Sequence, residues 1–369
     1  MDSRVKLLFL ALVIMLFNSI YQYSWNSISL LVSRTLNSSV TAIEVAFTLY
    51  AILSSFSQIG GGYIIDTIGP RLVGVISAIF FSLGFLIPVI FPNIILFYIS
   101  WSLGSIAEGI LYGIAVNVAL KWYENKRGFA TGIVSLGFGI GGAIFNPFIS
   151  IYRYYYDPFI IIGILSLFCL LLISFNVTYP PRDKLKGNSP KKIIRGKDWW
   201  LIYFSYSFAI IPLLSFSSSL SFLGSELPRW LLLLSITIFP VTSGLGRPLF
   251  GMLSDKMNRF HSVIILNSLT LLASLLSLLS LPLSAILVGL FGGSTLTLYL
   301  SLLGDIYGNK FSGTNTGILY TGKAFAGTLG SILLGYFITI SKSIALLFII
   351  VSPLISIILL LAASKVLSY

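Results

Sequence analysis

Twelve apolar stretches follow one another along this chain, and each is bounded by charged or turn-forming residues. A helix needs about 20 apolar residues to cross the hydrocarbon core of a bilayer, which is roughly 30 Å thick. Because no water reaches that core, the backbone must form its hydrogen bonds within the segment, which favours helices. The sequence therefore predicts an all-α membrane protein with transmembrane helices over residues 5–32, 41–65, 72–91, 94–120, 128–150, 158–178, 199–223, 228–250, 261–280, 282–303, 312–336 and 343–367.

The composition agrees with this prediction and excludes several kinds of protein. Only 9% of the 369 residues are charged and 56% are hydrophobic, whereas about a quarter of the residues of a soluble domain are charged. The single cysteine, Cys169, lies in an apolar run, and His261 is the only histidine. These counts exclude a disulfide framework and a cysteine-based metal cluster. We therefore expect no metal, no cofactor and no enzymatic activity, and twelve spans leave no room for a large soluble domain.

One long polar segment, residues 179–198, divides the apolar stretches six and six. Its proline, glycine and lysine residues favour a solvated linker, so we expect helical bundles over residues 1–178 and 199–369. If the N-terminus is cytoplasmic, 17 of the 23 Lys and Arg residues fall on the cytoplasmic face and 4 on the opposite face. This asymmetry predicts a plasma-membrane protein with both termini in the cytoplasm. The net charge of +12 is thus explained by cytoplasmic loops and not by nucleic-acid binding.

Two patterns recur at nearly the same interval. Gly62 precedes Asp66 by four residues, Gly251 precedes Asp255 by four, and the two aspartates are 189 residues apart. A second pair, 128–132 (GFATG) and 313–317 (GTNTG), is separated by 185 residues. The intervals indicate duplication of a six-helix unit, which predicts two pseudo-symmetric bundles of the kind found in secondary transporters. Glycine permits close helix approach, and an aspartate can bind a helix terminus. We expect a role in conformational gating for Gly62, Asp66, Arg71, Gly251, Asp255 and Lys256.

These loops resemble the signature of the major facilitator superfamily, although Thr67 stands where the signature usually has a basic residue. The run beginning at Lys121, KWYENKRGFATG, is similar to a motif of the oxalate:formate antiporter and monocarboxylate transporter branch. The stretches 246–256 (GRPLFGMLSDK), 304–308 (GDIYG), 317–323 (GILYTGK) and 21–25 (YQYSW) resemble the antiporters as well. The resemblance implies two six-helix bundles that carry a small solute by alternating access. We expect the protein to work as a monomer in the lipid bilayer.

Three ionisable residues, Glu108, Arg247 and Lys323, fall well inside predicted spans. Such residues are costly in the membrane and are functional candidates by default. From the rise of 1.5 Å per helical residue, Arg247 lies about 12 Å and Lys323 about 16 Å from the cytoplasmic helix ends, close to the midplane. Two converging cations would attract an anion, and the resemblance implies that they hold a carboxylate. Alternatively, both cations act as internal struts against backbone carbonyls or Glu108.

Neutral residues of the first half are the remaining candidates for substrate contact. The interval of 189 places Gln58 opposite Arg247, and a glutamine can donate to a second carboxylate or join helices structurally. Gln22, Tyr23 and Tyr112 could line the same side, although aromatic residues more often pack against lipid or neighbouring helices.

Glu108 has three open interpretations: a proton carrier, a salt-bridge partner for one of the cations, or a polar helix contact. The sequence predicts a secondary active transporter that exchanges small carboxylate anions such as oxalate and formate. If Glu108 carries a proton, the alternative is a proton-coupled symporter of a monocarboxylate such as lactate or pyruvate. A sugar or cation carrier is a further rival, but two buried cations disfavour it.

Overall fold

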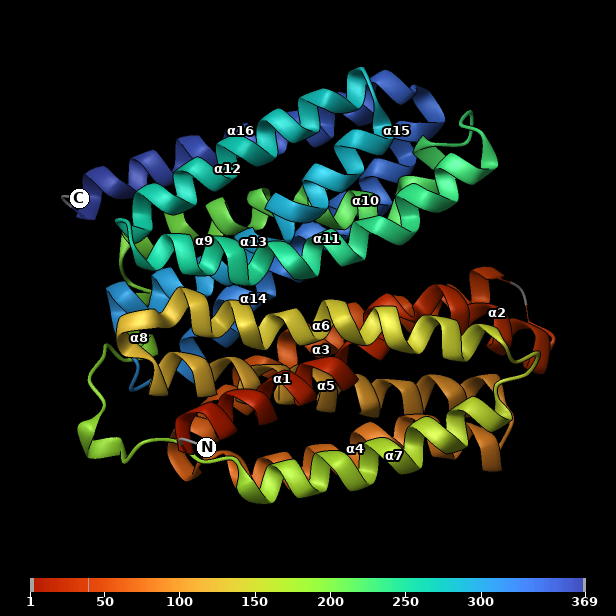
Figure 1. Ribbon diagram of the computed structural model, residues 1–369, viewed down its shortest axis with the longest axis horizontal. Helices are drawn as coiled ribbons and strands as arrows, with labels where there is room; N and C mark the ends of the chain where they lie inside the picture. The colour runs from red at the N-terminus through yellow and green to blue at the C-terminus, as the bar shows by residue number, and fades with distance from the viewer. Residues whose placement is uncertain (1–2, 39, 368–369) are drawn as a thin grey trace. The chain divides into compact units, whose positions relative to one another are not determined.

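The computed structural model describes residues 3–38 and 40–367 of the chain, which form helices joined by short loops (Figure 1). Among these residues there is no β-strand, only an isolated bridge between Gly187 and Gly308. The first seven helices are α1 (Ser3–Tyr23), α2 (Trp25–Leu36), α3 (Val40–Ile68), α4 (Pro70–Ile90), α5 (Ile94–Trp122), α6 (Arg127–Ser150) and α7 (Tyr156–Asn176). The others are α8 (Pro190–Ile193), α9 (Lys197–Ala209), α10 (Ile211–Leu223), α11 (Arg229–Asp255), α12 (Arg259–Leu275), α13 (Leu281–Tyr307), α14 (Ser312–Thr328), α15 (Leu334–Ile340) and α16 (Lys342–Leu367).

The prediction of an all-α membrane protein with twelve transmembrane helices is confirmed. Ten segments of the described chain are individually long and apolar enough to cross a bilayer. The other two are α3 and the segment made of α14, a π-helical turn (Leu329–Leu333) and α15. The short helix α8 lies in the predicted linker. Each expected span therefore corresponds to one helix or to one interrupted pair of helices.

Two compact units make up the chain. The first contains residues 1–122, 137–186 and 309–320, and the second contains 123–136, 187–308 and 321–369. The first turns of α6 thus pack within the second unit, and the first turns of α14 pack within the first. The division into bundles 1–178 and 199–369, with a linker between them, stays a prediction.

Two spans are interrupted at corresponding places. The first breaks at Ser24, between α1 and α2, where φ is −95° and ψ is 3°. The seventh breaks at Ile210, between α9 and α10, with φ −92° and ψ −3°. These residues are 186 apart, which is close to the intervals of the sequence repeat. Pro212 accounts for the second break, because proline has no N–H to donate to the preceding turn. The matching breaks support the pseudo-symmetry of the two halves.

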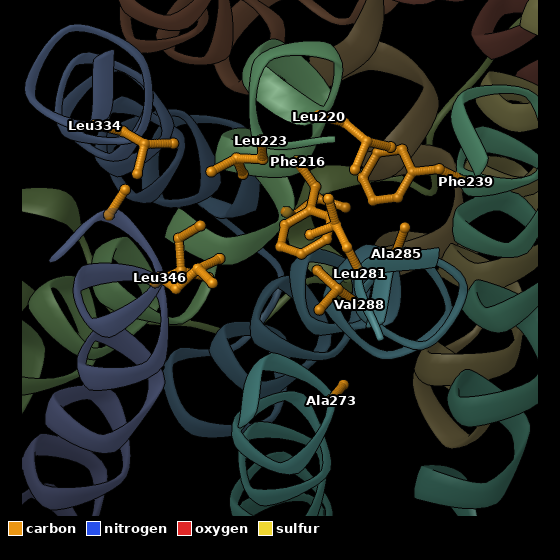
Figure 2. Close-up of a cluster of buried hydrophobic side chains, with 13 residues drawn as sticks. Phe216, Leu220, Leu223, Phe239, Ala273, Leu281, Ala285, Val288, Leu334 and Leu346 are labelled. Carbon is orange, nitrogen blue, oxygen red and sulfur yellow. The ribbon is translucent and has the colours of Figure 1, made fainter. Parts of the chain in front are cut away.

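Each unit has its own packed core. In the first unit Tyr21 contacts the rings of Phe81, Phe85 and Trp101, all fully buried, and its hydroxyl donates to the Phe81 carbonyl oxygen at 3.0 Å. In the second unit a cluster of aliphatic and aromatic side chains gathers residues of α10, α11, α13, α15 and α16, with Ala273 from α12 (Figure 2). Tight packing makes each unit a rigid frame for its polar groups.

Glycine and asparagine set two of the helix ends that position the loops. Gly69 has a φ of +90°, which a side chain would strain, and Pro70 then occupies the first turn of α4. The Asn258 side chain caps α12 by accepting hydrogen bonds from the backbone N–H groups of Phe260 and His261. The Gly69 turn places Arg71 in the first turn of α4, close to the end of α3.

Candidate functional site

Arg247 is a buried cation in the middle of a transmembrane helix. It lies on α11, only 3% of its surface is exposed, and its Nη1 donates a hydrogen bond to the Ser135 carbonyl oxygen of α6 at 3.1 Å. Close packing makes this contact possible, because a Cβ on Gly132 would lie 2.5 Å from the Arg247 carbonyl oxygen. The second unit therefore holds a buried guanidinium group on an apolar helix that is long enough to span a membrane.

Lys323 lies on α14, also in the second unit, and is half-buried. The two residues before Lys323 contact side chains of α9. Thr321 and Tyr203 share a hydrogen bond of 3.0 Å, and Gly322 packs closely against Ser207. Both predicted cations thus belong to the same unit. That they converge on one anion stays a prediction.

The neutral candidates Gln22, Tyr23 and Gln58 lie on α1 and α3 of the first unit. Gln58 is 3% exposed, and its amide nitrogen Nε2 donates no hydrogen bond to any residue in the described part of the chain. Gln22 accepts a hydrogen bond from Tyr50 at 3.2 Å. Tyr23 packs edge-on against Phe138, with ring centroids 5.2 Å apart. Gln58 therefore has an amide donor available to a ligand.

Glu108 and Tyr112 lie one turn apart on α5, and both are buried. The Ser54 hydroxyl, one turn from Gln58 on α3, donates a hydrogen bond to the Glu108 Oε2. The Tyr112 ring contacts Tyr320 at 4.7 Å and Phe138 at 6.0 Å between centroids. Since Phe138 also contacts Tyr23, the structure brings Tyr23 and Tyr112 to one aromatic group, with Glu108 next to it on the same helix.

Asp66 forms the first of two carboxylate networks. Its carboxylate accepts hydrogen bonds from Lys121 Nζ at 2.7 Å, from the backbone N–H groups of Gly313 and Thr314, and from the Thr314 hydroxyl. It therefore caps the N-terminus of α14, where the helix dipole favours negative charge. Gly62 allows this approach, since a Cβ there would lie 2.2 Å from the Gly313 carbonyl oxygen. We call these residues the Asp66 network.

Asp255 forms the corresponding network in the second unit. Its carboxylate accepts hydrogen bonds from the backbone N–H groups of Gly128 and Phe129 at 2.8 and 2.7 Å, and it pairs with Arg259 at 2.5 Å. It thus caps the first turns of α6. A Cβ on Gly251 would lie 2.0 Å from the Gly128 carbonyl oxygen. We call these residues, together with the pairs that Asp305 forms, the Asp255 network.

The two repeated patterns are therefore bonding partners of each other. Each aspartate binds a glycine-rich helix start from the other repeat, at 66 with 313–314 and at 255 with 128–129. The sequence identified both patterns but did not pair them. Their nearly equal intervals were the only signal that could have done so.

Each of the two aspartates also has one basic partner. Arg259, not Lys256, pairs with Asp255, and Lys256 is exposed. Arg71 is exposed, and in the described chain Asp66 pairs with Lys121 instead. Asp305, which lies in the 304–308 stretch, bridges Arg127 at 2.5 Å and Arg259 at 2.8 Å. Long-range ion pairs of this kind leave no local mark in the sequence.

Tyr179, just beyond α7, completes the surroundings of Lys121. Its hydroxyl donates to the Ile114 carbonyl oxygen at 3.0 Å, and Lys121 Nζ lies 4.9 Å from the centre of its ring. Burial, and secondarily the Asp66 carboxylate, raise the pKa of the Tyr179 phenol well above its usual value. The phenol is therefore neutral and remains a hydrogen-bond donor at physiological pH. Within residues 3–38 and 40–367 no three His, Cys, Asp or Glu side chains gather as a metal site would require.

Several known proteins are similar to this chain. A 38 kDa protein in the 23S RNA operon of Thermoproteus tenax is 41% identical over 339 residues, covering 91% of this chain and 89% of that protein. The oxalate:formate antiporter of Oxalobacter formigenes is 29% identical over 353 residues, covering 89% and 84%. The fucose:proton symporter FucP of E. coli superposes with a TM-score of 0.77 at 13% identity, over 98% of this chain and 100% of that chain.

The sequence pattern of the Major Facilitator Superfamily matches residues 7–330 and, in an overlapping second match, residues 230–367. The match spans nearly all twelve transmembrane segments, and the fold agrees with that of a solved member of the superfamily. The chain therefore belongs to the Major Facilitator Superfamily and is a multi-pass membrane transporter, not an enzyme.

Proposed function

We propose that the protein is a secondary active transporter that exchanges small carboxylate anions, of the oxalate and formate kind, by alternating access. The observation that carries this proposal is Arg247, a buried guanidinium group within an apolar helix long enough to span a membrane. A guanidinium matches a carboxylate with two parallel hydrogen bonds, and an ammonium such as that of Lys323 adds a mobile point charge. The name of the relative from Oxalobacter formigenes, an oxalate:formate antiporter, supports the same substrate class.

The cations supply the coupling between substrate and conformational change. An empty site with two positive charges is costly to enclose, because the charges lose their hydration. A bound dicarboxylate neutralises them and removes this cost. The carrier would then change conformation readily only when loaded, which favours exchange over net flux. Gln58 supplies a neutral donor, and we assign Gln22, Tyr23 and Tyr112 to the same substrate-facing side of the first unit.

We also assign a gating role to the glycine and aspartate residues of the two networks. Gly62 and Asp66 hold the start of α14, and Gly251 and Asp255 hold the start of α6. These contacts are made at helix termini and therefore form or break as units. The distribution of Lys and Arg along the sequence supports a position of these ends on the cytoplasmic side of the plasma membrane, with both termini in the cytoplasm.

One observation favours a second candidate, proton-coupled symport of a monocarboxylate. Glu108 is fully buried and accepts a hydrogen bond from Ser54. Buried carboxyl groups within transmembrane helices are candidate proton carriers. In this case Glu108 would take up a proton with each substrate molecule.

Counterflow in liposomes distinguishes the two functions. Purified protein is reconstituted with internal oxalate, formate, lactate or pyruvate, and uptake of external labelled oxalate is followed at two pH values. Exchange predicts uptake that requires an internal carboxylate, ignores an imposed pH gradient, and is lost in Arg247→Ala and in Lys323→Ala. Lys365→Ala, which removes an exposed cation at the end of α16, is the matched control and should transport normally.

Symport predicts a different result with the same preparations. A monocarboxylate would enter empty liposomes, driven by an inward proton gradient, and Glu108→Gln would abolish that uptake. This result would refute the exchange proposal. Folded Arg247→Ala and Lys323→Ala proteins that still exchange oxalate at the wild-type rate would refute the assignment of the two cations.

A further inference from the structure

A pocket of about 330 Å³ opens at the end of the first unit, where α3 passes into α4. It lies beside the Asp66 network and is separate from Arg247 and Lys323. Its floor and walls come from the α3–α4 turn, the end of α5, the segment after α7 and the turn before α14. The charged residues that line it are Asp66, Arg71, Lys121 and Lys310, and the neutral polar ones are Thr67, Thr178 and Tyr179. We call it the α3–α4 pocket.

Three cations and one carboxylate line this pocket, so its charge is unbalanced. Asp66 and Lys121 neutralise each other, with side chains 1% and 2% exposed. The Asp66 carboxylate is fully occupied by Lys121 and the start of α14. The side chains of Arg71 and Lys310 form no hydrogen bond or ion pair with any described residue. Two positive charges thus remain in the pocket.

The second unit shows what balances the equivalent charges there. The repeat intervals relate Asp255 to Asp66, and Gly128 and Phe129 to Gly313 and Thr314. Nearly the same intervals relate Arg259 to Arg71 and place Lys310 close to the position of Arg127. In the second unit Asp305 bridges Arg127 and Arg259, at 2.5 and 2.8 Å.

Among the described residues of the first unit, no carboxylate stands at the corresponding place. An interval of 184 relates Asp305 to Lys121, so a cation stands where the second unit has an anion. The Asp255 network is electrically balanced, with two aspartates and two arginines. The α3–α4 pocket has the two cations without the bridging anion.

We propose that the α3–α4 pocket binds a phosphate-bearing anion between Arg71 and Lys310, which replaces the missing bridging carboxylate. A guanidinium donates two hydrogen bonds to phosphate, and lysine binds it as a point charge. The bound phosphate holds the α3–α4 turn to the turn before α14. It therefore stabilises the Asp66 network, as Asp305 stabilises the Asp255 network.

Such a phosphate can come from a lipid headgroup or from a soluble anion. Ile68 lines the pocket and is 61% exposed, and Leu72 follows Arg71 and is 60% exposed. Apolar side chains at the end of a transmembrane helix offer a surface for acyl chains beside the cationic pocket. Basic pockets between transmembrane helices on the cytoplasmic side bind anionic headgroups in this way. The apolar rim favours the lipid source.

Lipid titration of the purified full-length protein in detergent tests the proposal. After delipidation, the protein is titrated with phosphatidylglycerol, with phosphatidylcholine or with inorganic phosphate at constant ionic strength. Bound lipid is counted by native mass spectrometry, and the melting temperature is recorded. We expect phosphatidylglycerol to bind more tightly than the zwitterionic lipid and to raise the melting temperature. Inorganic phosphate that reproduces the stabilisation and competes with the lipid would identify a soluble ligand for the same pocket.

Variants of Arg71 and Lys310 test whether the anion binds in the α3–α4 pocket. In Arg71→Gln/Lys310→Gln the affinity for phosphatidylglycerol should fall by roughly tenfold or more, because two charge-assisted contacts are lost. Arg71→Lys should lose less affinity than the double variant, because it keeps the positive charge but not the paired hydrogen bonds. Lys365→Gln, which removes an exposed cation elsewhere, should match the wild type. Lys310→Gln alone gives the same test if the double variant does not fold. Equal anion affinity in the wild type and the cation variants, or no stabilisation by any probe, would overturn the proposal.

Discussion

The close approach of α3 to α14 in the first unit depends on the absence of a side chain at Gly62. An alanine Cβ there would lie 2.2 Å from the Gly313 carbonyl oxygen, 2.4 Å from its carbon and 2.8 Å from the Thr314 nitrogen. All three atoms are backbone atoms and cannot rotate away. To restore van der Waals contact in Gly62→Ala, the two helices must separate by roughly 1 Å.

The separation has a calculable effect on stability. Overpacking of this kind lowers the free energy of unfolding by about 1–3 kcal/mol. A helix shift of this size also lengthens the hydrogen bonds from Gly313 and Thr314 to Asp66, which are 3.1 and 2.8 Å long. Replacing glycine by alanine within a helix returns only about 0.5–1 kcal/mol. Gly62→Ala should therefore be destabilising by on the order of 1–2 kcal/mol. Gly60, two residues earlier on the same helix, is exposed, and a Cβ there would meet no neighbouring side chain or helix within 4 Å, so Gly60→Ala should be neutral or slightly stabilising.

Unfolding of the two variants in detergent tests this reasoning. The melting temperature of Gly62→Ala should fall below that of the wild type, while that of Gly60→Ala should not. Gly251→Ala provides a second test, because a Cβ there would lie 2.0 Å from the Gly128 carbonyl oxygen in the second unit. If Gly62→Ala were as stable as Gly60→Ala, the close contact between α3 and α14 would be disproved.

Two further predictions concern the Asp66 network. Asp66→Ala should lower the free energy of unfolding by about 3–5 kcal/mol, because it removes the partner of a buried cation. Lys121→Met should lower it less, since Asp66 keeps its hydrogen-bond donors at Gly313 and Thr314. The double variant should be more stable than Asp66→Ala alone, and additive losses in a double-mutant cycle would contradict the pairing. Burial and Asp66 raise the pKa of Tyr179, so its neutral phenol contributes stability that is complete below the unfolded value of about 10 and is lost as the pH rises further. Between about pH 9 and pH 11, the melting temperature of Tyr179→Phe should therefore fall less than that of the wild type. If the melting temperatures of the two proteins fell equally with pH, this role of Tyr179 would be refuted.

Local patterns in the sequence predicted the fold well. Each span is an apolar run, and hydropathy along a run does not depend on distant residues, so the structure confirmed the spans to within a few residues. The duplication was also visible, because it preserved the glycine and aspartate positions at intervals of 185 and 189. The break at Ile210 has a local signal in Pro212, whereas the break at Ser24 has no comparable signal.

Partners in the networks could not be predicted in the same way. The sequence placed a basic residue near each aspartate, and Asp255 does pair with Arg259, four residues further on, but Asp66 pairs with the distant Lys121. Side chains five residues apart across a turn need not meet, while residues 55 apart on neighbouring helices can. Spacing alone therefore could not identify Lys121 as the partner of Asp66, and the gating role of all these residues stays a proposal.

By itself the sequence determined that this chain is a twelve-helix transporter with an internal repeat, and it placed Glu108, Arg247 and Lys323 within predicted transmembrane segments. Hydropathy and repetition can be read along the chain without knowledge of its folded contacts. Only the tertiary structure decided that Asp66 caps a helix that begins 246 residues later at Ser312. It likewise decided that Asp305 is shared by two arginines, and that Arg71 and Lys310 face one pocket. Such contacts depend on how helices pack, and packing is set by the whole shape of each surface and not by any local pattern.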